Sequence, residues 1–162
     1  MIKRAAKTLS IATTLVAATL FLRAQSGLPS PEKADVPYLI HATSLVETEQ
    51  SEAQEEERKN DFLYVVPGAA SGVKTPLAGP EFLFRTGNLD PGEIQLYRLE
   101  SKNGRRELLF RRKKKILADP LHVSVFPLQE GLVKLRVDES LSAGEYCLTP
   151  NGTNAVFCFT VY

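Results

Sequence analysis

Several residue types that carry much of protein chemistry are scarce in this chain of 162 residues. It has no tryptophan, two cysteines, two histidines and one methionine. Transition metals need clustered histidine, cysteine or carboxylate ligands, yet His41 and His122 lie far apart with no cysteine near either. No metal site is therefore expected, and both histidines are interpreted as satisfied within strands or facing solvent.

Motifs for cofactors and for nucleophilic catalysis are also missing. The sequence has no glycine-rich phosphate loop and no dinucleotide fingerprint, so no cofactor is expected. The stretch Gly68-Ala-Ala-Ser71-Gly72 departs from the Gly-x-Ser-x-Gly nucleophile elbow, and no helical pattern follows it. We interpret it as a loop. A small secreted hydrolase built around Ser71, His122 and a carboxylate is the alternative hypothesis.

Long apolar runs are missing except at the N terminus. Three basic residues precede the apolar run 9–22, and Ala24 offers a small residue for cleavage. This order is typical of a secretory signal peptide, and the run is shorter than the about 20 apolar residues of a spanning helix. Residues 1–24 are therefore predicted to be the signal peptide of a secreted or periplasmic protein, with no membrane span after cleavage. An uncleaved N-terminal anchor is the alternative.

The rest of the chain is long enough for one domain with its own core. Residues 25–37 are rich in proline and are predicted to be a linker, and residues 38–162 are predicted to form the domain. Within it, residues 45–60 are acidic and polar, with six glutamates between Glu47 and Glu57. No continuous apolar face runs through this insert, so we interpret it as a solvated loop or a short frayed helix.

Short β-prone runs bounded by glycine, proline and asparagine fill most of the domain. Their number and spacing predict an all-β fold of the sandwich type. The predicted strands are 37–42, 61–66, 81–85, 93–100, 106–112, 121–128, 132–137, a strand ending at 150, and 155–162.

The clearest turn in the middle of the chain is Asn-Gly at positions 103–104. This pair favours a type I′ hairpin turn, because both central residues need positive φ. The resulting register puts Leu99 opposite Leu108 and Tyr97 opposite Phe110, so these four side chains are predicted to share one face.

Near the C terminus, Leu141-x-x-Gly144-x-Tyr146 resembles the tyrosine corner of immunoglobulin-like and fibronectin type III-like domains. The resemblance implies a single antiparallel immunoglobulin-like β-sandwich of about seven to nine strands. It also implies a hydrogen bond from Tyr146 back to the preceding connection. Antibody domains have cysteine two residues after this tyrosine, whereas Cys147 follows it directly, so Cys147 is not expected between the sheets. The chain is otherwise similar to small secreted proteins of bacteria, which implies no activity.

The last two strands are predicted to form a hairpin that is closed by a disulfide. A four-residue loop at 151–154 places Cys147 directly opposite Cys158, at a distance that a disulfide accepts, and an exported chain meets an oxidising compartment. The cysteines are predicted to face outward, and free thiols, an intermolecular bond or a redox pair are the alternatives. Asn151-Gly-Thr also matches the N-glycosylation acceptor pattern but is interpreted as a turn. The residues predicted to share the inner face are Tyr146, Leu148, Phe157 and Phe159.

Basic residues cluster at both ends of the predicted strand 106–112. We consider three interpretations: a contact surface for an anionic partner, a solvated loop that discourages edge pairing, and an internal counterpart of the acidic segment 47–57. Nucleic acid is not expected as the partner, because export and the lack of interleaved exposed aromatics disfavour it. The cluster comprises Arg105, Arg106, Arg111, Arg112, Lys113, Lys114 and Lys115.

From these residues we predict an exported, non-enzymatic binding or cell-envelope-associated module. Its contact surface would be its loops and the basic cluster, and its partner would be a protein or an envelope glycan. A structural subunit that pairs with a partner through an edge strand is a further alternative, beside the small hydrolase.

Overall fold

Regular structure in the described residues is β, apart from one 3-10 turn at Pro91–Glu93. The computed structural model describes residues 29–58, 61–111 and 118–162, so the predicted signal peptide lies outside the described residues. The all-β prediction is confirmed. The strands are β1 Pro37–His41, β2 Ser44–Glu47, β3 Glu49–Glu52, β4 Gln54–Arg58, β5 Asp61–Pro67, β6 Lys74–Thr75, β7 Glu81–Arg85, β8 Ile94–Lys102, β9 Arg105–Arg111, β10 Val123–Gln129, β11 Leu132–Val137, β12 Gly144–Pro150 and β13 Ala155–Val161.

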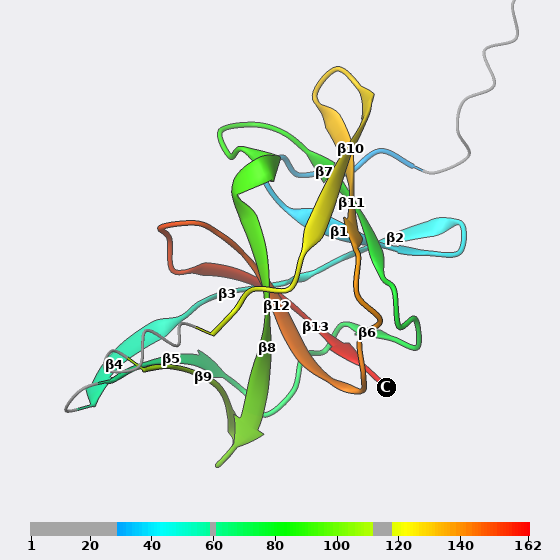
Figure 1. Ribbon diagram of the computed structural model, residues 1–162. Helices are drawn as coiled ribbons and strands as arrows, with labels where there is room; N and C mark the ends of the chain where they lie inside the picture. Colours follow the sequence, from blue (N-terminus) through cyan, green and yellow to red (C-terminus); the bar gives the residue numbers. More distant parts are fainter. Residues whose placement is uncertain (1–28, 59–60, 112–117) are drawn as a thin grey trace, which may run out of the picture.

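These strands form two sheets (Figure 1). The first is five-stranded, in the order β10-β11-β7-β1-β2. The second is eight-stranded, in the order β3-β13-β12-β8-β9-β5-β4, with β6 added beside β13. Neighbouring strands are antiparallel except for the short β6–β13 pair. Thirteen strands exceed the predicted seven to nine, and β2, β3, β4 and β6 account for the excess.

The acidic insert 45–60 is not the loop or frayed helix that its composition indicates. Its described part forms β2, β3 and β4, which pair with β1, β13 and β5 respectively. Glutamate has low intrinsic preference for strands, but pairing and side-chain contacts with neighbouring strands override such preferences. Here β9 supplies arginines: Glu49 pairs with Arg106 and Glu56 with Arg105. The interpretation of this insert was therefore wrong, because its polar composition did not indicate that β13 and two arginines about fifty residues later would pair with it.

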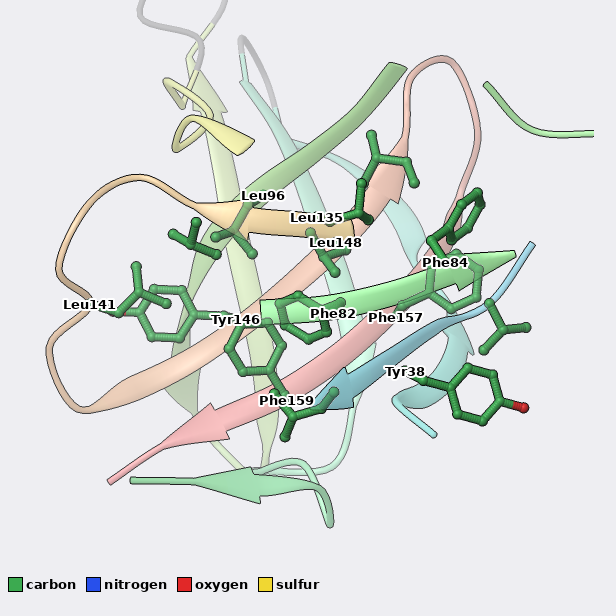
Figure 2. Close-up of a cluster of buried hydrophobic side chains, with 14 of the residues drawn as sticks. Tyr38, Phe82, Phe84, Leu96, Leu135, Leu141, Tyr146, Leu148, Phe157 and Phe159 are labelled. Atoms are coloured by element: carbon green, nitrogen blue, oxygen red, sulfur yellow. The ribbon is translucent and has the colours of Figure 1, made fainter. Parts of the chain in front are cut away.

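The main core lies between the five-stranded sheet and the strands β8, β12 and β13 of the other sheet. Figure 2 shows its large side chains converging from both sides. The rings of Phe82 and Phe159 lie 5.2 Å apart, and those of Tyr146 and Phe159 are stacked at 5.7 Å. Alternate residues of the predicted strand 132–137 face this core, because Val133, Leu135 and Val137 are buried in it.

A third layer covers the other face of β8, β12 and β13. Strands β3 and β4 are the two ends of the eight-stranded order, yet only Ala53 separates them along the chain. The sheet therefore curls, so that β4, β5 and β9, at the lower left of Figure 1, form a layer over the face of β8, β12 and β13 that is opposite the main core. Buried residues gather under this layer in what we call the pocket cluster: Ala53, Val66, Leu99, Cys147, Val156 and Cys158.

The terminal hairpin has the predicted register. Cys147 pairs with Cys158 and Tyr146 with Phe159, and the two sulfurs are bonded, with the Cα atoms 4.0 Å apart. The Tyr146 hydroxyl donates to the carbonyl of Ser142 at 2.9 Å, which is the bond that the corner motif implies. Tyr146 belongs to the main core and Cys147 to the pocket cluster, so the prediction of opposite faces is confirmed.

The predicted outward position of the disulfide was wrong, however. Cys147 is 2% exposed and Cys158 is fully buried. Alternation along a strand determines which side chains share a face, and it does so correctly here. It cannot show that a third layer, built from β4, β5 and β9, covers the face opposite the core.

The residues before β1 are packed onto the domain, although 25–37 was predicted to be a linker. Val36 and Pro37 are buried. The Asp35 carboxylate accepts hydrogen bonds from the backbone N–H groups of Gly87, Asn88 and Leu89. Partial burial opposes ionisation of Asp35, but these three donors prevail and lower its pKa.

Candidate functional site

The described residues form a pocket of about 360 Å³ where β8 and β9 diverge. Near the turn, these strands pair from Lys102–Arg105 as far as Glu100–Glu107. Beyond that point β8 pairs with β12 on its other side, while β9 continues beside β5. The β8–β9 hairpin therefore opens like a fork, and its open side forms two walls of the pocket.

The turn that sets this fork has the predicted geometry. Asn103 and Gly104 have φ values of 53° and 76°, as a type I′ turn requires. The Tyr97 and Phe110 rings, predicted to face each other across the hairpin, lie 5.9 Å apart although their strands have separated. Side chains rather than backbone hydrogen bonds thus span the gap.

Three half-buried aromatic rings line the pocket. Phe110 is central, because it packs edge-on against Tyr97 and, at 5.1 Å, against Tyr64 of β5. Below them the pocket is closed by members of the pocket cluster and by Leu108. The inner end is therefore apolar.

Polar groups lie at the rim. They come from Gln95 and Thr149 and from the β12–β13 loop, residues 151–154. Most of these groups already have partners within the chain: Thr149 Oγ1 donates to the Ala155 carbonyl at 2.8 Å, and Asn151 Nδ2 donates to Glu93 at 3.1 Å. The loop is thereby held in place beside the opening.

Gln95 differs from these rim residues. The Tyr97 hydroxyl donates to Gln95 Oε1 at 2.8 Å, which leaves the Gln95 amide N–H groups as donors at the rim. Burial raises the pKa of Tyr97, so this phenol keeps its proton at neutral pH. Burial and a hydrogen bond to Glu55 likewise raise the pKa of Tyr64. No described residue that lines the pocket is charged.

The structure buries two members of the basic cluster against glutamates. Arg106 is 1% exposed, and its guanidinium pairs with Glu49 at 2.6 Å and donates to the Gly68 carbonyl at 3.1 Å. Arg105 is half-buried between Glu56 at 2.8 Å and Glu107 at 2.6 Å. Both arginines thus match the internal interpretation, in which the acidic segment 47–57 lies against the basic cluster. Arg106 cannot belong to an exposed contact surface without unfolding of this region.

The other members of the basic cluster remain predictions. Arg111 ends β9 and pairs in register with Asp61 of β5. Arg112, Lys113, Lys114 and Lys115 lie outside the described residues.

The structure does not bring the residues of the hydrolase alternative together. Ser71 is 1% exposed; its backbone N–H donates to Glu145 at 2.8 Å, and its hydroxyl donates to the Cys158 carbonyl at 3.2 Å. His122 lies beside the other sheet, is exposed, and contacts Asp138. Within residues 29–58, 61–111 and 118–162, no group of three or more histidine, cysteine or acidic side chains could hold a metal ion.

Edge strand β10 carries two exposed apolar side chains, Phe126 and Leu128. The Phe126 ring is partly covered by cationic side chains of β11, with the Arg136 guanidinium 4.6 Å from its centroid. Cation–π contact thus accounts for Phe126 within the chain itself.

Sequence reasoning placed Tyr97, Leu99, Leu108 and Phe110 on one face but did not indicate a pocket. The hairpin register was sufficient to group them. What it could not show is that the strands separate beside them and leave a pocket, because that depends on the pairing of β8 with β12.

Comparisons with protein-family models, with curated proteins and with solved structures find no match to this chain. In the part of the chain that the structure describes, no helix is long and apolar enough to cross a membrane.

Proposed function

We propose that this protein is an exported, non-enzymatic binding module that holds a small ligand in the pocket between β8 and β9. The pocket itself is the observation that carries the proposal. Its volume of about 360 Å³ lies in the range of about 300–1,000 Å³ that is common for small-molecule sites. Apolar walls with a few polar groups at the opening are also typical of such sites.

The composition of the pocket supports binding rather than catalysis. General acid–base chemistry uses histidine, carboxylate or amine groups with tuned pKa values. The described lining has none of these groups, and its tyrosines keep their protons at neutral pH. Labelling of Ser71 by a serine-directed probe would contradict the non-enzymatic part of the proposal.

We further infer that the two sheets around the main core form an immunoglobulin-like sandwich. The hydrogen bond from Tyr146 to Ser142 supports this inference, as does the packing of two antiparallel sheets. The Cys147–Cys158 disulfide supports export, because such bonds persist mainly in oxidising compartments. Mass spectrometry of the exported protein should find an N terminus near Gln25; an intact Met1 would contradict cleavage of a signal peptide.

The pocket can be tested with a neutral apolar dye, N-phenyl-1-naphthylamine, whose fluorescence rises in apolar surroundings. Neighbouring leucines of β9 provide matched variants: Leu108 lines the pocket, whereas Leu109 is 39% exposed and does not. We expect saturable one-to-one binding that Leu108→Trp weakens at least about tenfold, because the indole fills the pocket. Leu109→Trp should bind the dye like the wild type.

Two outcomes would overturn the proposed site. One is the absence of saturable dye binding by the folded wild-type protein. The other is unchanged dye affinity in Leu108→Trp, provided that the variant unfolds cooperatively and is therefore correctly folded.

A further inference from the structure

The pocket combines three properties that restrict the chemistry of its ligand. Its inner end is apolar, because residues of the pocket cluster and three aromatic rings line it. The described residues at its rim are polar but uncharged. One rim side chain, Gln95, accepts a hydrogen bond from Tyr97 with its carbonyl oxygen, and its two amide N–H groups remain as donors.

From these properties we propose that the ligand is a neutral amphiphile. Its apolar arm enters the pocket cluster, and a hydrogen-bond acceptor such as an amide carbonyl stays at the rim against Gln95. The proposal rests on the proposed function above, since it names the ligand class of the same pocket.

The uncharged lining of the described pocket disfavours amphiphiles that carry a carboxylate or an ammonium group. An ion at the end of an apolar arm would lose part of its hydration near the rim and would find no oppositely charged side chain among the described residues that line the pocket. Among the described lining residues, a carboxylate could accept from Gln95 but would find no cation, and an ammonium would find no carboxylate and would have to share the Gln95 oxygen with Tyr97. A neutral amide loses less hydration and gains the Gln95 hydrogen bond.

The Tyr97 hydroxyl fixes the orientation of the Gln95 amide at this rim. Without the bond from the Tyr97 hydroxyl, the Gln95 amide could rotate and present its oxygen instead of its nitrogen. We therefore assign Tyr97 as a positioning residue and Gln95 as the residue that determines preference for an acceptor.

The test compares three compounds with the same ten-carbon chain: decanamide, decanoate and decylammonium, each below its aggregation concentration. The chain has five tyrosines and no tryptophan, and Tyr64 and Tyr97 line the pocket, so intrinsic tyrosine fluorescence reports on binding. We expect decanamide to bind at least about tenfold more tightly than either ion. Equal affinities for the three compounds, or tighter binding of an ion, would overturn the proposal.

Two glutamine variants test whether Gln95 causes the preference for a hydrogen-bond acceptor. Gln95→Leu should weaken decanamide binding about five- to tenfold, as loss of one hydrogen bond predicts, and should weaken the binding of N-phenyl-1-naphthylamine, which has no acceptor carbonyl, by less. Gln129→Leu, on exposed β10, should change neither affinity. Unchanged decanamide binding in Gln95→Leu would contradict the assigned role of Gln95.

The outcomes separate this inference from the proposed function. If the dye binds in the pocket but the three ten-carbon compounds bind equally, the pocket stands and the ligand class is wrong. If neither dye nor amphiphile binds, both proposals fail. Intermolecular nuclear Overhauser effects from the chain methyl group should reach Leu99 and Leu108, and contacts from the amide end to these leucines would contradict the orientation.

Discussion

The side chains on the two faces of the β12–β13 hairpin are packed to different extents in this protein. On one face, Tyr146 and Phe159 belong to a core whose large side chains are sealed from solvent. On the other face, the pocket cluster is buried, but the aromatic rings above it, including Tyr97 and Phe110, remain half-buried around a pocket. The main core thus gains the full energy of burial, whereas the pocket face leaves apolar surface available to a ligand.

This comparison can be tested most strongly by removing one aromatic ring from each face. Phe159→Ala deletes a fully buried ring and should lower the free energy of unfolding by about 3–5 kcal/mol. Phe110→Ala deletes a half-buried ring and should cost about half as much, since less apolar area leaves water when this ring folds. Urea unfolding measures both, and equal losses would show that the two faces do not differ in this way.

The ion pair between Arg106 and Glu49 joins β9 to β3 across the curled sheet. Arg106→Met should destabilise the protein by about 3–5 kcal/mol, because Glu49 is left without its partner in a partly buried position. Leu109→Met, on the exposed side of the same strand, is the control and should change the free energy of unfolding little. A loss in Arg106→Met as small as that of the control would argue against this closure.

The same pair predicts a dependence on pH. Burial opposes ionisation of Glu49, but the hydrogen bond and positive charge of Arg106, together with hydrogen bonds from Ser71 and Gly72, outweigh burial, so the pKa of Glu49 falls below its usual 4.5. A depressed carboxylate pKa stabilises the fold above the unfolded pKa, and this stabilisation is lost as the pH falls through the folded pKa. Chemical unfolding between pH 7 and pH 3 should therefore show a smaller acid-induced loss in Arg106→Met than in the wild type; identical losses would contradict the coupling.

A disulfide joins the two strands at the base of the pocket. The double variant Cys147→Ala and Cys158→Ala should lose about 3 kcal/mol, as closure of this short loop predicts. Because both sulfurs are buried, the native protein should also resist labelling by thiol reagents after mild reduction. Rapid reduction and labelling without unfolding would show that the pocket face opens more readily than the structure indicates.

The smallest expected effect lies at the corner. Tyr146→Phe keeps the ring in the main core and removes only its hydrogen bond to Ser142, which should cost about 1 kcal/mol. Dye binding in the pocket should not change, because the hydroxyl points away from that face. Weaker dye binding in Tyr146→Phe would show that the two faces are coupled through the hairpin.

Much of this fold is determined by local sequence. The terminal hairpin register, the disulfide, the Asn103-Gly104 turn and the inward pattern of the strand 132–137 all follow from alternation and from turn chemistry. Each depends on residues that are close in the chain, where strand period and loop length leave few alternatives.

Only the tertiary structure decided what lies on either side of those strands. The glutamate-rich segment becomes β3 and β4 because Arg105 and Arg106, about fifty residues later in the chain, neutralise it beside strands that accept its backbone. The same curl buries Cys147 and Cys158 under a third layer and separates β8 from β9 at the pocket. Sequence alternation therefore sorted the side chains by face, but long-range strand pairing determined which face became a sealed core and which became a pocket.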